Sequence, residues 1–161
     1  MKKIVFLILV FGSLQGVGQA RVWSNFGDEA LQEGDYYGAS RFYLKAWEED
    51  STLNGLIHKL GVAFKGYHNN KGALLYFKKI ENNKTLQIQH PDYLFHLAEL
   101  YKATEEYSLS RDYFEKFSRV KSGFGSFRYL KAKNELQVYR DVLRLLEDSA
   151  DVSIKNLGNH V

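Results

Sequence analysis

The chain contains no cysteine, and this absence removes several kinds of chemistry. Disulfide bonds, cysteine–zinc sites and thiol catalysis are excluded for these 161 residues. A bacterial lipoprotein anchor is excluded as well, because it requires a cysteine directly after the signal peptide and Arg21 stands there. The chain has a single proline and no low-complexity run, so we expect a folded protein without a disordered tail.

Catalytic motifs are also missing. The five histidines form no H-E-x-x-H motif and do not pair at metal-ligand spacing on one helix, and G-x-S-x-G does not occur. The segment from Gly123 to Ser126 has no Lys-Ser/Thr after it, so it does not complete a phosphate loop. We therefore expect structural or solvated histidines, no metal, no cofactor and no enzymatic activity. The alternative of a carbohydrate-active enzyme would need two carboxylates in one pocket.

The one long apolar run lies at the N-terminus. Two lysines precede the run from Ile4 to Phe11, and small residues follow up to Ala20, which is the layout of a secretory signal peptide over residues 1–20. A membrane anchor is the alternative, but a spanning helix needs roughly 20 apolar residues and glycine and polar residues interrupt this run after Phe11. We expect an exported, periplasmic protein, associated with the outer membrane and without a spanning segment after cleavage.

Charge gives no indication of nucleic-acid binding. Removal of Lys2 and Lys3 from the 22 basic residues leaves 20, against 19 acidic residues, so the processed chain is close to neutral. A local basic excess remains towards the C-terminus and is the one candidate basic face, formed by Arg111, Lys116, Arg119, Lys121, Arg128, Lys131 and Lys133.

A regular repeat organises the rest of the chain. Small and aromatic residues recur at one fixed spacing, as in Gly27 and Gly61 or Tyr43 and Phe77. The third copy follows a three-residue insertion, so that Phe114 comes slightly later than this spacing would place it. The spacing and the residue types match the tetratricopeptide (TPR) pattern, whose period is about 34 residues.

The pattern predicts an all-α TPR solenoid of three helix-turn-helix repeats. The repeats are expected at about residues 21–53, 54–87 and 91–121, with a capping helix over 126–148. Gly34 and Asp35 should end one helix and begin the next. The alternating residues 149–161 predict a linker or the first strand of a following domain.

The first helix of each repeat should line a concave face that binds a partner protein. Residues just off the packing stripe of these helices are the candidate contacts, with one exposed aromatic among them: Asn25, Asp28, Gln32, His58, Val62, Lys65, Phe95, Glu99 and Lys102.

With repeats, leader and tail together, the chain resembles the N-terminal region of OmpA-family (PorE-like) envelope proteins of gliding, type IX-secreting bacteria. The residues that carry the resemblance are the stretch from Gly34 to Ala39, the three repeats, and the segment from Ile154 to Asn159. The resemblance implies a non-catalytic scaffold that binds an envelope or secretion-machinery protein. An alternative role is a spacer in an anchor that contacts peptidoglycan only through C-terminal domains outside this sequence.

Overall fold

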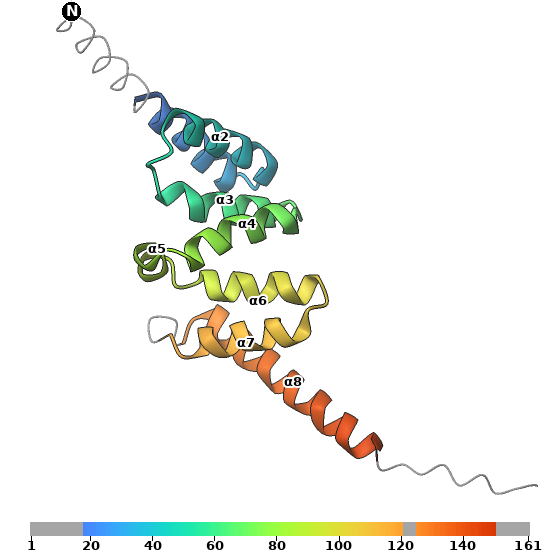
Figure 1. Ribbon diagram of the computed structural model, residues 1–161. Coiled ribbons are helices and arrows are strands. Elements are labelled where there is room, and N and C mark those ends of the chain that lie inside the picture. The colour runs from blue at the N-terminus through green and yellow to red at the C-terminus, as the bar shows by residue number, and fades with distance from the viewer. Residues whose placement is uncertain (1–17, 121–124, 151–161) are drawn as a thin grey trace, which may run out of the picture.

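The computed structural model describes residues 18–120 and 125–150, and within these ranges the chain is helical with short turns and has no strand (Figure 1). The helices are residues 18–32, α2 (Tyr36–Glu49), α3 (Gly55–Gly66), α4 (Asn70–Glu81), α5 (Lys84–Gln89), α6 (Tyr93–Ala103), α7 (Tyr107–Ser118) and α8 (Phe127–Ala150). The prediction of an all-α fold is confirmed for this part of the chain. Most of the expected signal peptide and the expected strand fall outside it, at residues 1–17 and 151–161.

The turns inside the first two repeats use the same device. Gly34 has a φ of +80°, and His68, one repeat period later, has a φ of 63°. Asp35 then caps α2, because its carboxylate accepts a hydrogen bond of 2.8 Å from the backbone N–H of Gly38, and Asn69 caps α4 in the same way. The roles predicted for Gly34 and Asp35 are confirmed.

The connection between the second and third repeats, lengthened by the three-residue insertion, contains a short helix, α5, which the sequence pattern did not predict. Asn82 ends α4, and the side chain of Asn83 at once caps α5 by accepting from two backbone N–H groups. Leu86 anchors α5 in the core with 1% of its surface exposed. The helix ends at Gln89, and His90 follows as its C-cap, where the His90 carbonyl accepts a hydrogen bond of 3.0 Å from the backbone N–H of Tyr93 at the start of α6.

Small residues let the two helices of a repeat approach closely. Tyr43, Phe77 and Phe114, at the repeating aromatic position, are fully buried. A Cβ atom placed on Gly27 would lie 2.4 Å from the Tyr43 ring, and one on Gly61 would lie 2.9 Å from the Phe77 ring. The second-helix aromatic of each of these repeats therefore fills the space that a glycine leaves on the first helix.

Helix α8 stands in the position of the first helix of a fourth repeat. It begins at Phe127, one repeat period after α6 begins at Tyr93, and its buried Ala132 follows Ala98 at the same interval. Its N-terminal half packs on α7, as the expected cap would. The expectation does not hold for the C-terminal half, which projects past α7 (Figure 1), because Leu146 there is 60% exposed. None of the helices in the described ranges is long and apolar enough to cross a membrane.

Candidate functional site

The predicted concave face carries a series of ion pairs between successive first helices. Asp28 on the first helix pairs with Lys59 on α3 at 2.7 Å. Further along, Lys65 on α3 pairs with Glu99 on α6, whose other oxygen lies 2.6 Å from Lys131 on α8, and Lys102 on α6 pairs with Glu135 on α8. We call these seven side chains the charge ladder. Four of the predicted contact residues, Asp28, Lys65, Glu99 and Lys102, thus hold the repeats to one another.

The other predicted contacts lie in different surroundings. Asn25 and Gln32 are exposed, Val62 is half-buried, and His58 belongs to a cluster of histidines described below. Phe95 is only 3% exposed and packs against Phe114 and Phe117 on α7. The expectation of an exposed aromatic at Phe95 is therefore wrong: helical spacing placed it beside the packing stripe, whereas the ring turns into the core.

Glu99 is the most constrained member of the charge ladder. Burial would raise the pKa of its carboxyl, but the hydrogen bonds and charges of Lys131 and Lys65 outweigh burial and lower this pKa from the ordinary 4.5. A folded-state pKa below the unfolded one means that the stabilisation is present above pH 4.5 and is lost as the pH falls through the folded value.

Replacement of Glu99 by glutamine is therefore expected to lower the free energy of unfolding by about 1.5–3 kcal/mol at pH 7, the range for hydrogen bonds to charged groups. Denaturant unfolding at a series of pH values should show the difference from wild type shrinking below pH 4.5. Glu115→Gln is the matched control, because its pair with Arg119 is long (3.8 Å) and exposed, and it should cost less than about 0.5 kcal/mol. Equal effects of the two variants would contradict a structural ladder.

The predicted basic face is divided between two helices and is largely neutralised. Lys121 lies outside the described residues. Arg128 and Lys131 on α8 turn towards α6, where they pair with Asp92 and Glu99. The remaining members contact an acid or an aromatic ring close to them in the chain: Arg111, Lys116, Arg119 and Lys133.

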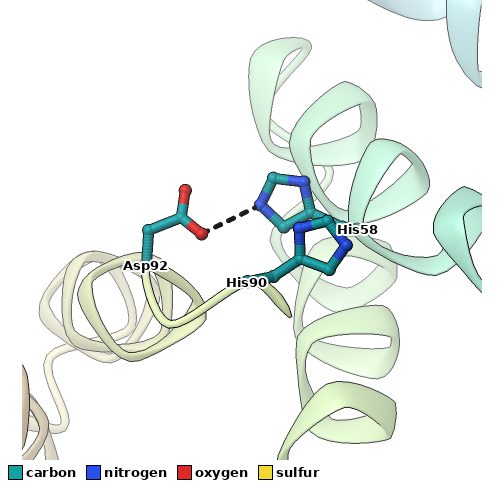
Figure 2. A group of neighbouring side chains, drawn as sticks. All are labelled: His58, His90 and Asp92. Carbon is teal, nitrogen blue, oxygen red and sulfur yellow. Dashed lines mark ion pairs between the residues drawn. The ribbon is translucent and has the colours of Figure 1, made fainter. Parts of the chain in front are cut away.

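Histidines and an aspartate meet where α3 faces the connection between α5 and α6. Figure 2 shows His58 of α3, His90 at the end of α5, and Asp92 just before α6. The rings of His58 and His90 stack with centroids 4.3 Å apart. The Asp92 carboxylate lies 3.3 Å from Nε2 of His58 and 3.5 Å from Nε2 of His96. Sequence reasoning missed this acidic partner of the histidines, because Asp92 lies far from His58 in the sequence.

The surroundings of this cluster favour an ionised Asp92 and neutral rings of His90 and His96. Burial would raise the pKa of Asp92, but the nearby imidazoles of His58 and His96 hold this pKa well below its ordinary range. Burial lowers the pKa of His96, and burial together with the neighbouring His58 lowers the pKa of His90. An ionised carboxylate therefore lies among imidazoles of which at least these two are neutral at pH 7.

A second surface feature is an apolar groove of about 430 Å³ along the projecting half of α8. It lies between that half of α8, the first turn of α7 and the end of α6, and Lys102 and Glu135 of the charge ladder line one part of it. Its apolar lining, which defines the α8 groove, comprises Tyr107, Val138, Tyr139, Val142, Leu143 and Leu146.

The α8 groove has a fixed base and exposed walls. The Tyr139 hydroxyl donates to Ser110 on α7 at 2.9 Å, and Ser110 donates to the backbone carbonyl of Ala98 on α6 at 2.8 Å. By contrast, Leu143 is 47% and Tyr107 is 53% exposed. The sequence predicted that this helix caps the solenoid, and no second helix in the described part of the chain covers these exposed residues.

Comparison with known proteins identifies the fold. No protein family and no curated protein matches the sequence. Among solved structures, the TPR domain of Sgt2 from Aspergillus fumigatus is similar, with a TM-score of 0.61 and 12% identity over 88% of this chain and 90% of that chain. The described part of this chain is therefore an all-α TPR solenoid. At this identity the likeness concerns the fold alone.

Proposed function

We propose that this chain is a non-catalytic TPR scaffold that docks an amphipathic helix of a partner protein in the α8 groove. One observation carries the proposal: the α8 groove is an exposed, contiguous apolar surface on a rigid base. Grouped exposed apolar side chains, in contrast to scattered ones, are typical of interaction sites. Apolar residues on α8 recur three to four positions apart, which suits the face of a second helix.

The repeats themselves indicate what kind of segment fits. Each earlier first helix is covered by the second helix of its own repeat, as α3 is by α4 and α6 is by α7. Helix α8 begins in register with those first helices, and its projecting half has no such covering helix among the described residues. A partner helix in the α8 groove would take the place of the second helix of a fourth repeat, with its apolar face on Val138, Val142 and Leu143.

The partner belongs, in this proposal, to the cell envelope or the secretion machinery. The signal-peptide pattern of residues 1–20 supports export to the periplasm, and the resemblance to OmpA-family envelope proteins supports an outer-membrane-associated role. The same resemblance is compatible with a spacer role, in which the TPR part binds nothing and other domains anchor the protein.

A photo-crosslinking amino acid at Leu143, expressed in the native host, tests the proposal. We expect one dominant crosslink to another envelope protein, at a peptide that forms an amphipathic helix. The purified pair should bind, and Leu143→Asp should weaken this binding by at least about 30-fold, as for an interface hot spot. Its midpoint of thermal unfolding should stay close to that of wild type, because Leu143 is half exposed.

Leu75 is the matched control, since this leucine on α4 is 56% exposed and lies outside the α8 groove. The crosslinker at Leu75 should not capture the same protein, and Leu75→Asp should leave the affinity unchanged. Crosslinks from Leu143 only to a second copy or to the chain's own tail would overturn the proposal, and the absence of any crosslink would favour the spacer role.

A further inference from the structure

The cluster of His58, His90 and Asp92 has the composition and spacing of a metal site, independently of the α8 groove. One ligand atom from each of the three residues lies within 4.8 Å of the others. They come from three segments, namely α3, the end of α5 and the residue before α6 (Figure 2). Two imidazoles and one carboxylate are a ligand set that suits borderline divalent cations such as Zn²⁺.

Asp92 and His58 each lack an interaction that is usual at such a position, namely a helix cap for Asp92 and a hydrogen bond for the buried Nε2 of His58. Asp92 precedes α6, yet its carboxylate caps no backbone N–H of that helix and instead faces His58 and His96. Nε2 of His58 is buried and makes no hydrogen bond to any described residue, although it lies 3.3 Å from the carboxylate. Buried polar atoms in folded proteins usually have a partner. These two ligand atoms are therefore positioned for a group that would bind between them.

His96 supports the cluster from behind. The Lys65 ammonium group lies 3.1 Å from Nδ1 of His96 and can only donate there, so the proton of the neutral ring is on Nε2. That N–H faces the second oxygen of Asp92 at 3.5 Å, and the side chain of His96 is only 7% exposed. A buried imidazole that orients a ligand carboxylate is a common outer partner of protein-bound metals.

We propose that His58, His90 and Asp92 bind a divalent transition-metal ion of the Zn²⁺ type, with water completing the coordination. Ligand atoms about 2.0–2.2 Å from a tetrahedral zinc ion lie roughly 3.3–3.6 Å from one another. His58 and Asp92 are already 3.3 Å apart, so it is the His90 ring that must come closer to both. Rotation of the His90 ring out of its stack on His58 supplies this approach. Arg128, 3.3 Å from Asp92 and half exposed, turns out into solvent when the ion enters.

Such an ion would join the second repeat to the third. His58 belongs to the second repeat, Asp92 begins the third, and His90 ends the inserted helix α5 between them. An ion that binds the folded chain and not the unfolded chain stabilises the fold, and this stabilisation grows with the logarithm of the free Zn²⁺ concentration once that concentration exceeds the Kd. Helix α5 is not required by the repeat pattern, and its proposed role is to place the ligand His90, its C-cap, beside the other two ligands.

Calorimetric titration of the purified full chain with ZnCl₂, after treatment with a chelator, tests the site. We expect one Zn²⁺ per chain, a thermal midpoint that rises with Zn²⁺ concentration, and visible absorption bands of tetrahedral type with Co²⁺. His90→Ala and Asp92→Asn should each weaken Zn²⁺ binding by at least about 100-fold, and His96→Asn by about 10-fold or more, since outer partners contribute 10- to 100-fold.

His68→Asn is the matched control, because it removes an exposed histidine outside the cluster and places asparagine at a positive φ that this residue tolerates. It should bind Zn²⁺ like wild type. Thermal unfolding of every variant in the presence of chelator shows whether the variant still folds, so that a loss of Zn²⁺ binding can be separated from unfolding. His90 lies at a helix end, where alanine is tolerated. The proposal is overturned by the absence of saturable 1:1 binding, or by His90→Ala and Asp92→Asn variants that fold in chelator and bind Zn²⁺ as wild type does.

Discussion

Replacement of Phe77 by alanine is expected to lower the free energy of unfolding by about 3–5 kcal/mol, the usual cost of a large cavity in a core. Phe77 is fully buried. Its ring lies under Gly61, stacks on His96 with centroids 4.8 Å apart and meets the edge of His58. Because the ring is enclosed in the core, its removal leaves a cavity. The lost free energy of unfolding therefore includes both the transfer free energy of the apolar ring and the cost of the empty cavity.

Denaturant unfolding followed by circular dichroism measures this effect, and Leu75→Ala on the same helix is the control. Leu75 is 56% exposed, so its truncation should change the free energy of unfolding by less than about 0.5 kcal/mol. A Phe77→Ala variant that loses no more stability than Leu75→Ala would contradict the packing of α4 on α3.

Replacement of Gly61 by leucine is expected to destabilise the protein by about 3 kcal/mol, at the upper end of the usual cost of overpacking. A Cβ atom alone would lie 2.9 Å from the Phe77 ring, and that ring has no room to withdraw because it is fully buried. The helical preference of leucine over glycine, up to about 1 kcal/mol, offsets only part of this cost. The two helices of the second repeat would have to separate.

Gly55 provides the comparison within the same helix. A Cβ atom at Gly55, the first residue of α3, would have no atom within 4 Å. Gly55→Leu should therefore leave the thermal midpoint unchanged or slightly raised. If Gly61→Leu unfolded at the same temperature as Gly55→Leu, the close approach of α3 to α4 would be wrong.

The sequence predicted those parts of the fold in which a position requires one residue type for a single physical reason. Only a residue without a side chain admits the ring of Phe77, and this is why Gly61 recurs with Gly27 in the pattern that predicted the repeats. The pair Gly34 and Asp35 likewise combined a left-handed conformation with a side-chain cap. Because each of these features is local or recurs with the repeat period, the repeat fold followed from the sequence.

The candidate sites could be predicted less well from the sequence than the fold could, because they depend on which residues the fold brings together. Helical spacing alone could not tell that Phe95 turns into the core or that Glu99 meets lysines from two other helices. His58 and Asp92 lie far apart in the sequence but are neighbours in the fold. Helix α5 brings His90 beside them, and in the sequence the only sign of this helix was a three-residue offset in the repeat. The sequence predicted a helix over 126–148, but it could not show that no other helix within residues 18–120 and 125–150 covers the second half of this helix.

Amide hydrogen exchange, with and without the partner captured from Leu143, tests the central claim that the α8 groove is the docking surface. The account predicts added protection at residues 138–147 of α8 and at the first turn of α7, with little change at residues 25–32 and 58–65. Protection confined to the concave first helices, around residues 25–32 and 58–65, would contradict it and would place the partner on the face that the repeat pattern first indicated.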